Sequence, residues 1–276
     1  MSGTLYLVGT PIGNLGDLSV RALETLRSAD FIAAEDTRVT LKLLNFLEIK
    51  KPLVSYYEHN KLESGPKIVR RIQDGETCVL VSDAGSPAIS DPGEDLVRLC
   101  AENGVEVRAV PGCCAAVNAL AVSGLPTGRF TFEGFLTVNK KSRREHLDSL
   151  KDETRTMIFH EAPHKLRTTL EDLCAAFGPE RRIALCREIT KLHEEVRRCT
   201  LAEAIAYYEE NTPKGEYVLV VEGAAPKTGA AVTLEDGVAQ VLTLKEQGMR
   251  LKDAAKEVAE HTGLSKNELY AAALER

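Results

Sequence analysis

The sequence predicts an α/β protein with largely parallel strands joined by crossover helices, and three observations favour that class. Short apolar runs of strand length alternate with segments of helical length along most of the chain. The 276 residues suffice for about two domains. Hydrophobic residues make up 43% and charged residues 28%, as in soluble globular proteins, which excludes disordered and collagen-like chains.

Eight apolar runs are expected as strands: Leu5–Val8, Phe31–Ala34, Val79–Val81, Val105–Val110, Phe130–Phe132, Thr156–Phe159, Ile183–Cys186 and Tyr217–Val221. Helices are expected between them. The first starts at Asp17 or Ser19, either of which can cap it, and runs to about Ser28. Others span Pro66–Gln73 and Asp95–Glu102. Strands that alternate with helices favour parallel pairing, because the helices supply the crossovers.

Two Gly- and Pro-rich stretches, 123–128 and 223–231, predict domain boundaries. We therefore expect α/β domains over residues 1–124 and 125–225 and a helical module over residues 232–276. The module should contain amphipathic helices at Glu235–Gln247, Leu251–His261 and Ser265–Leu274, with the look of a helix-turn-helix. It is slightly acidic, which argues against DNA and favours packing or a protein contact.

The cysteines and the apolar runs indicate the cellular compartment of the protein. The seven cysteines include several inside apolar runs, which is more typical of reduced core thiols than of a disulfide framework. No C-x-x-C pair occurs, so no structural metal is expected. No apolar stretch approaches the ~18 residues of a membrane span, and the amino-terminus lacks a basic signal-peptide region. We expect a cytoplasmic protein with no membrane contact.

Three loops rich in Gly, Pro and small residues follow predicted strands, where open α/β sheets bind ligands. They cover residues 9–14, 82–93 and 110–120. Each has a structural alternative, respectively a tight βα turn, a loop held by Asx turns, and close packing of a helix on a sheet. Glu35-Asp36 ends the next strand and would suit a ribose hydroxyl, but G-x-G-x-x-G and the phosphate loop are absent.

The three loops contain neither Lys nor Arg, which disfavours a phosphate-rich cofactor. A cofactor that is itself cationic and is held through backbone groups fits better. S-adenosylmethionine is such a molecule.

Seven segments, in this order, resemble the tetrapyrrole-methylase superfamily: GTPIGN, SDAGSPAISDPG, VPGCCAAVNALAVSGLP, FTFEGF, FHEAPHKL, REITK and KGEYVLVVEG. Within it they resemble the small-subunit ribosomal RNA 2′-O-ribose (cytidine) methyltransferases, which act near the decoding centre. The resemblance covers about residues 3–223, and the helical module is similar to the extra domain of that family. It implies two α/β domains, each around a mixed sheet, with S-adenosylmethionine in a cleft between them, and a homodimer.

The resemblance also implies a set of cofactor-binding residues in the loops and in the second domain. Ser86 stands where the superfamily has Asp, and Ala115 where it has Ser, so backbone contacts alone are expected to persist at these two positions. The implied residues are Gly9, Pro11, Gly13, Gly85, Ser86, Pro87, Ile89, Pro111, Cys114, Ala115, Ala116, Phe159, His160, Gly215 and Glu216.

The implied reaction is attack of a ribose 2′-oxygen on the sulfonium methyl group, for which a general base would help. The main candidates are Asp36, Glu161 and Lys191, and Glu133 is a further one. Each has a structural alternative: a helix N-cap for Asp36, an ion-pair partner for Glu133 and Glu161, and a surface charge for Lys191.

Residues 137–200 carry an excess of basic side chains, in contrast to the acidic remainder of the chain. Charge alone favours an ordinary solvated face, whereas the resemblance implies that these residues contact RNA phosphates. The candidates for substrate binding are Lys140, Lys141, Arg143, Arg144, Arg187 and Arg38, with Tyr56 and His59 for base stacking. Tyr56 and its neighbour Tyr57 can equally be buried loop tyrosines.

The expected substrate is 16S ribosomal RNA within the 30S subunit. Two alternatives stay open. One is an enzyme of the same fold acting on a small tetrapyrrole-like substrate, and the other is a ligand-sensing regulator with a helix-turn-helix.

Overall fold

A wholly parallel sheet forms the first part of the chain in the computed structural model, which describes residues 3–89, 91, 93–225 and 233–275. Its strand order is β3-β2-β4-β1-β5. The strands are β1 (Thr4–Val8), β2 (Phe31–Ala34), β3 (Leu53–Ser55), β4 (Cys78–Val81) and β5 (Glu106–Val110). β2 and β4 are buried at every position, which explains their unbroken apolar sequences.

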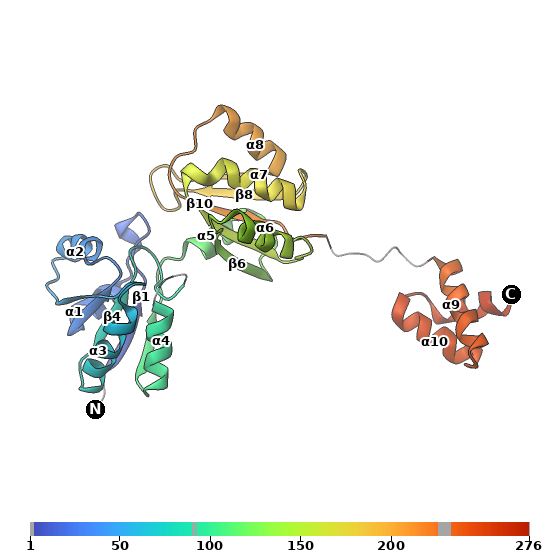
Figure 1. Ribbon diagram of the computed structural model, residues 1–276, viewed down its shortest axis with the longest axis horizontal. Coiled ribbons are helices and arrows are strands. Elements are labelled where there is room, and N and C mark those ends of the chain that lie inside the picture. The colour runs from blue at the N-terminus through green and yellow to red at the C-terminus, as the bar shows by residue number, and fades with distance from the viewer. Residues whose placement is uncertain (1–2, 90, 92, 226–232, 276) are drawn as a thin grey trace. The chain divides into compact units, whose positions relative to one another are not determined.

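Helices cover both faces of this sheet (Figure 1). They are α1 (Val20–Ser28), α2 (Thr37–Phe46), α3 (Lys61–Gln73) and α4 (Gly93–Glu102), with a 3₁₀ turn, η1, at Leu15–Asp17. In β2, Phe31 packs with the α3 and α4 side, whereas its neighbour Ile32 packs with the α1 and α2 side. The Ser19 hydroxyl caps α1 by accepting the Ala22 N–H at 3.1 Å, which confirms one of the two predicted starts.

The second sheet is mixed, with the order β6-β7-β10-β8-β9. Its strands are β6 (Phe130–Phe135), β7 (Thr156–Glu161), β8 (Arg182–Arg187), β9 (Glu195–Thr200) and β10 (Tyr217–Val221). β6 pairs with β7 in parallel, whereas β10 is antiparallel to β7 and β8, and β8 to β9. The expectation of largely parallel strands is therefore wrong for this sheet, and the expectation of two mixed sheets is wrong for the first.

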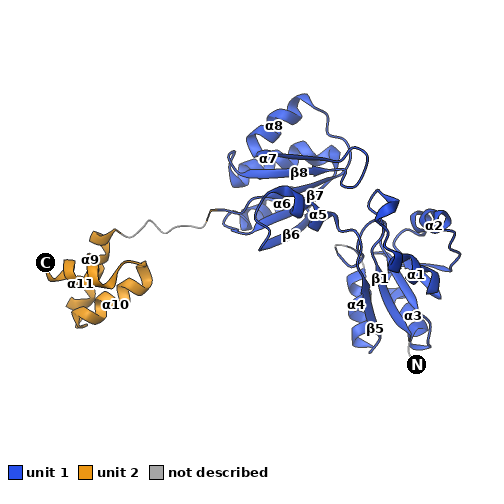
Figure 2. Ribbon diagram, turned by 180° about the vertical axis from the view of Figure 1, so that it is seen from behind, with its two compact units in different colours: residues 1–224 blue, residues 225–276 orange. Residues whose placement is uncertain are grey.

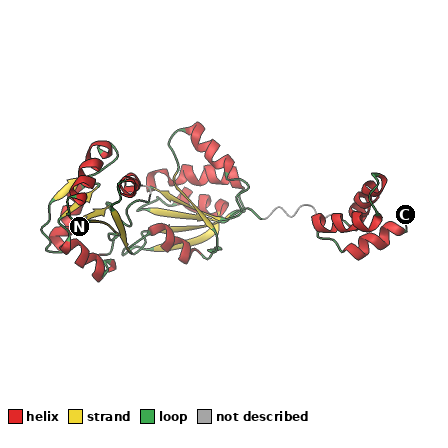
Figure 3. Ribbon diagram, turned by 90° about the horizontal axis from the view of Figure 1, so that it is seen from below, coloured by secondary structure: helices red, strands yellow, loops and turns green. Residues whose placement is uncertain are grey.

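The two faces of the second sheet carry different helices (Figure 3). α6 (Lys140–Ser149), α7 (Leu166–Phe177) and α8 (Leu201–Glu210) enclose one core with β7, while the 3₁₀ turn η2 (Pro163–Lys165) leads into α7. α5 (Ala115–Ser123), which follows β5 of the first sheet, packs on the opposite face. Thus α5 carries the chain from the first sheet directly onto the second.

Residues 225–276 form a separate compact unit (Figure 2). Its helices α9 (Leu234–Glu246), α10 (Leu251–Thr262) and α11 (Lys266–Leu274) confirm the three predicted ones. Thr233 and Asp236 form a capping box at the start of α9, and Val241, Ala255 and Leu269 are fully buried between the helices. Residues 226–231 of the predicted boundary 223–231 lie outside the described residues. The same holds for residues 232 and 276, which are the limits of the predicted module, and for Ser90 and Pro92 of the second loop.

Three elements differ from the prediction. β3 and β9 are missing from it, and both are edge strands. β3 has only 3 residues, and β9 is largely polar, so neither shows as an apolar run. α3 starts at Lys61 rather than at Pro66. Pro66 costs the helix one backbone N–H, but the first turn is anchored by Lys61, whose ammonium contacts Glu58 at 2.7 Å and Asp95 at 2.6 Å.

Candidate functional site

The three predicted loops follow β4, β1 and β5, which are adjacent in the first sheet, and they join directly. Thr10 and Gly85 form a two-way backbone bridge, with N–H···O distances of 2.9 and 3.1 Å. The Ser86 hydroxyl donates to the carbonyl of Cys113 at 3.0 Å. These bonds connect the second loop to the first and to the third. We call this junction, formed by residues 9–13, 82–87 and 111–115, the turn junction.

Glycine is required at the centre of the turn junction. A Cβ atom added to Gly9 would lie 2.8 Å from Cα of Gly112, and one added to Gly112 would lie 2.7 Å from Cα of Gly9. Both are backbone atoms, so a side chain could not be accommodated by a rotamer change. Gly85 has a φ of +86°, a conformation that L-residues rarely adopt. The junction is thus a backbone cradle, and its close contacts exclude side chains.

α5 begins at the turn junction with unsatisfied backbone amides. Its N-cap, Cys114, accepts no side-chain hydrogen bond, and the first amide to bond back is that of Asn118, at 3.0 Å from the Cys114 carbonyl. The preceding N–H groups of Ala115 and Ala116 therefore offer donors and a partial positive charge at this end.

His160 lies on the face of the second sheet that α5 covers. It shares a face of β7 with Ile158, which packs against α5. Its ring makes edge contacts with Phe132 and Phe135, each 5.4 Å between centroids, and its buried Nε2 has no hydrogen-bond partner among the described residues. Burial lowers the pKa of His160, which favours the neutral ring. An unpartnered polar atom of this kind is suited to a ligand.

Phe159 and Glu161 point to the other face of β7, away from α5. Phe159 is fully buried in the core with α7. Glu161 is 4% exposed, accepts the Thr169 hydroxyl of α7 and takes the Ala162 N–H at 2.8 Å. The predictions that Phe159 covers the cofactor and that Glu161 acts as base are corrected by this alternation. Glu133 accepts a bond from His146 at 2.8 Å, as its structural alternative supposed.

Lys191 connects the first loop with the second domain. Its ammonium contacts Glu188 at 2.8 Å and Glu216 at 2.7 Å. Its aliphatic chain covers Gly13, where an added Cβ would lie 2.3 Å from Cγ of Lys191. The structure therefore brings Gly13, Lys191, Gly215 and Glu216 together.

The charges of this cluster decide what Lys191 can do. Burial opposes its charge, but the bonds to both carboxylates outweigh burial and raise the pKa of Lys191. A lysine held in its protonated form is unsuited to accept a proton, which corrects its candidacy as general base. Burial likewise opposes ionisation of Glu188, yet the bonds from Lys191 and the Glu216 N–H lower the pKa of that carboxyl.

Asp36 is the N-cap of α2 and pairs with Arg38. Its Oδ1 accepts the Arg38 N–H at 2.8 Å, and its Oδ2 lies 2.6 Å from the guanidinium. These hydrogen bonds lower the pKa of Asp36 to about 2, so it is a weak base. The N-cap alternative is confirmed, and Arg38 is engaged with it. In contrast, burial, together with Asp83, Asp91 and Asp36, raises the pKa of Glu35 at the end of β2.

Some of the predicted substrate-binding residues are exposed, whereas others are buried or paired with acidic side chains. Tyr56 is 2% exposed in the core of the first sheet, so its ring is not accessible to a base, and the buried-tyrosine alternative holds for it. His59 is exposed beside Tyr57. Arg187 contacts Glu195 at 3.2 Å. Arg143 is buried and bonds Asp172 at 2.5 Å and the Thr169 hydroxyl at 2.7 Å, so its charge is used inside the protein.

A groove of about 680 Å³ between α6 and α7 collects the remaining basic side chains. Lys140, Arg144 and Lys165 line it, and none of them has an ion-pair or hydrogen-bond partner among residues the structure describes. Of its two acidic lining residues, Asp172 is paired with Arg143, and Asp148 with Lys151 at 2.8 Å. The groove is electropositive. Lys165 was not predicted as a substrate-binding residue, because in sequence it lies apart from the basic run at 140–144.

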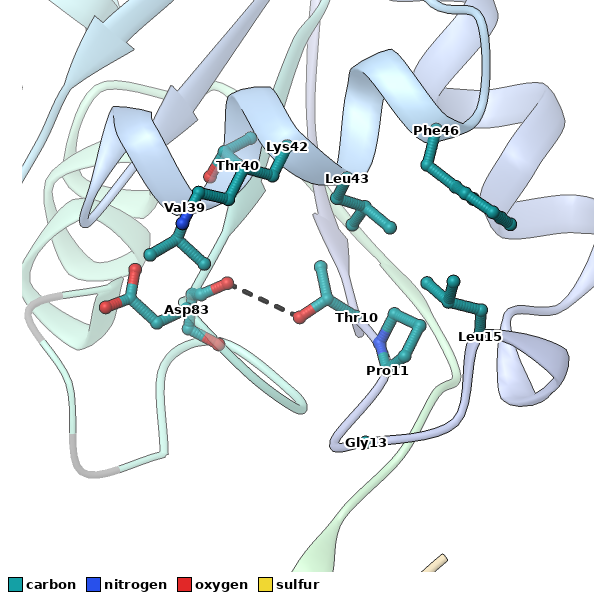
Figure 4. Close-up of a pocket in the computed structure, with 11 residues that line it drawn as sticks. Thr10, Pro11, Gly13, Leu15, Val39, Thr40, Lys42, Leu43, Phe46 and Asp83 are labelled. Atoms are coloured by element: carbon teal, nitrogen blue, oxygen red, sulfur yellow. Dashed lines mark hydrogen bonds between the residues drawn. The ribbon is translucent and has the colours of Figure 1, made fainter. Parts of the chain in front are cut away.

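A second hollow, of about 340 Å³, lies between the first loop and α2 (Figure 4). Its walls are mostly apolar, and Asp83 and Lys42 add charges. Phe46, Val39 and Leu15 are partly exposed there. This hollow could not be predicted from the sequence, because its wall comes from the outward face of an ordinary amphipathic helix.

Within the described residues, no group of three or more His, Cys, Asp or Glu side chains is placed to hold a metal ion. Among the described helices none is both long and apolar enough to cross a bilayer.

Comparisons with known proteins cover almost the whole chain. The family model of the tetrapyrrole (corrin/porphyrin) methylases matches residues 4–205, and that of the RsmI C-terminal HTH domain matches residues 232–276. A protein of Synechocystis sp. named ribosomal RNA small subunit methyltransferase I is 47% identical over 99% of this chain and 98% of its own. Its namesake in Escherichia coli O157:H7 is 44% identical over 99% and 96%.

Solved structures share the fold at lower identity. The methyltransferase CobJ aligns with a TM-score of 0.60 and 21% identity over 81% of this chain and 95% of its own. Uroporphyrin-III C-methyltransferase from Thermus thermophilus, in complex with S-adenyl homocysteine, gives a TM-score of 0.53 and 19% identity over 79% and 97%.

Proposed function

The chain belongs to the tetrapyrrole (corrin/porphyrin) methylase family, and from this premise we propose that it is an S-adenosylmethionine-dependent methyltransferase of small-subunit ribosomal RNA. The group methylated is the 2′-hydroxyl of a cytidine ribose. The observation that carries the proposal is the turn junction, a backbone cradle without Lys or Arg. Relatives named for this RNA match the chain over its full length.

The cradle fits the proposed cofactor in shape and in charge. The amides at the start of α5 and the unpartnered Nε2 of His160 offer polar contacts, while a neutral His160 adds no positive charge that would repel a sulfonium. Glu216 and Glu188 supply negative charge near Gly13. When bound, S-adenosylmethionine supplies an electrophilic methyl group on a sulfonium. Gly9, Gly13, Gly85, Pro87, Pro111 and Ala115 would hold it through the backbone.

The chain's own contribution is positioning. Lys191 acts as a positioning residue, because it fixes the loops that bear Gly13 and Glu216. Asp36 and Arg38 set the start of α2, and the Asp36 N–H donates to Asp83 Oδ1 at 3.0 Å, which ties the end of β2 to the second loop. Asp36 and Lys191 thus contribute to positioning and are not proposed as general bases.

Substrate RNA is held by the α6–α7 groove and its surroundings. Lys140, Arg144 and Lys165, with Lys141 nearby, would neutralise phosphates without reading sequence. A tetrapyrrole-like substrate is the less supported alternative, because it needs neither this groove nor the helical module. The acidic module also disfavours the DNA-binding regulator. We further propose that the enzyme is cytoplasmic and acts on 30S particles. We also propose that the chain forms a homodimer.

The test is incubation of the protein with labelled S-adenosylmethionine and purified 30S particles, with free 16S RNA and duplex DNA in parallel. Nuclease digestion and mass spectrometry then locate the label. We expect it on the 2′-oxygen of a cytidine in 16S RNA. Label on a base, or none on RNA while a tetrapyrrole is methylated, would overturn the proposal. Light scattering of the same sample measures the oligomeric state.

A further inference from the structure

The hollow between the first loop and α2 adjoins the turn junction and is separate from the basic groove. Figure 4 shows it between Thr10 and Pro11 on one side and Leu43 and Phe46 on the other. We propose that this hollow, which Phe46 and Asp83 line, binds the cytosine base of the nucleotide that is methylated. The inference rests on the proposed function, and it adds the site that selects the base.

The hollow is continuous with the turn junction, so an occupant would lie next to the proposed cofactor site. Thr10, Pro11 and Gly13 line the hollow and belong to the first loop, while Ser82 and Asp83 belong to the second. The Thr10 hydroxyl lies 3.4 Å from the Ser82 carbonyl and fixes the floor between them. A base held here would bring its own ribose toward the cradle, as a 2′-O-methyl transfer requires.

The size and the walls favour a single flat ring. About 340 Å³ is near the lower limit of small-molecule pockets, and a four-ring macrocycle would need more. Val39, Leu43 and Phe46 lie at positions i, i+4 and i+7 of α2 and form one apolar wall. The Phe46 side chain is 64% exposed although it is aromatic, and Leu15 stands opposite, 46% exposed. Enzymes that act on an unstacked nucleotide hold its base between aromatic and apolar side chains.

The polar groups favour a base with an amino group. Asp83 Oδ1 accepts the Asp36 N–H, and its Oδ2 has no partner in the described part of the chain. A carboxylate accepts only, so it pairs with the exocyclic amino group of cytosine and rejects the carbonyl that uracil has at the same position. Lys42, at the rim, carries a charge suited to a flanking phosphate.

The experiment is NMR of the full chain with labelled Leu and Val methyl groups, titrated separately with cytidine, uridine and S-adenosylhomocysteine. Cytidine should shift the methyls of Leu15, Val39 and Leu43 at concentrations at which uridine does not. Shifts of these methyls by S-adenosylhomocysteine instead would assign the hollow to the cofactor and overturn the inference. So would equal shifts by both nucleosides, or none by either.

Kinetics with 30S particles separate this inference from the proposed function. Phe46→Ala should raise KM for the particles at least about fivefold through lost base stacking, and Phe46→Tyr should restore it. Asp83→Asn keeps the acceptor for the Asp36 N–H and should reduce the preference for cytidine over uridine. Phe130→Ala, an exposed aromatic of β6 outside the hollow, is the matched control. If the native chain methylates 16S RNA while Phe46→Ala is unimpaired, the base site is wrong and the proposed function stands. Light scattering of Phe46→Ala reports whether the wall instead contacts a second copy.

Discussion

The turn junction and the second sheet contribute to the candidate site in different ways. The junction is made of backbone contacts among three loops at adjacent strand ends, with Gly9 and Gly112 in direct contact. The second sheet contributes side chains, and their use depends on which face of β7 they occupy. His160 faces α5, whereas Phe159 and Glu161 on either side of it face α7. A backbone site tolerates no added atom, whereas a side-chain site can be altered one group at a time.

The largest effect should come from Gly112→Val, which tests the backbone half of the comparison. The new side chain would meet Gly9, and separating β1 from β5 should cost about 1–3 kcal/mol of stability and abolish measurable binding of S-adenosylhomocysteine. Calorimetric titration and thermal melts measure the two. Gly128→Val is the control, since an added Cβ there meets nothing within 4 Å. Native affinity in Gly112→Val would contradict the cradle.

Next in size is the contrast between two adjacent arginines of α6. Arg143→Gln leaves the Asp172 carboxylate without its cation and the Thr169 oxygen without its donor. It should cost about 2 kcal/mol, less than the loss of a fully buried pair, because Asp172 is partly exposed. Arg144→Gln should leave stability unchanged, weaken RNA binding about threefold and lower the salt dependence by about one phosphate. Urea unfolding and filter binding at two salt concentrations measure them. The reverse pattern would exclude the groove as the RNA contact.

Lys191→Met tests how the second domain is coupled to the first loop. It leaves Glu188 and Glu216 close together without a cation, and cofactor affinity should fall about tenfold, with Lys191→Arg close to native. The lowered pKa of Glu188 stabilises the native chain above the carboxyl's ordinary pKa and loses this effect as pH falls through the folded value. The difference in melting temperature between native and Lys191→Met should therefore shrink below about pH 4.5. A difference independent of pH would argue against the ion cluster.

The smallest effect is expected for His160→Gln. Because burial lowers the pKa of His160, the unfolded chain binds a proton first as pH falls below about 6.5, and the folded state loses stability there. The melting temperature of the native chain should fall by a few degrees between pH 7.5 and 5.5 through this group. His160→Gln should fall less, while the exposed His193→Gln should behave as native. If the melting temperatures of the native chain and of both variants depended on pH in the same way, His160 would not be a buried imidazole with a lowered pKa.

The parts of the site that depend on the position of a loop could be predicted from the sequence. The role of a side chain could not be predicted where it depends on the face of a strand or on a contact with another side chain. The three loops could be found because Gly and Pro after an apolar run mark the end of a strand. Glu161 and Phe159 were misjudged because a run such as Thr156–Phe159 is apolar on both faces and hides which residues face the cleft. Arg143 and Arg144 are equivalent in sequence, and only the packing of α6 on α7 distinguishes them.

The order of strands in the first sheet has a consequence for synthesis of the chain. β5 is the last of its strands to leave the ribosome and pairs at the sheet's edge with β1, the first. The wall on which α5 rests is completed later still, by β10 at Tyr217–Val221. A nascent chain therefore cannot acquire its binding site piecemeal, and a product truncated before Tyr217 should be inert even though every glycine of the three turns has been translated.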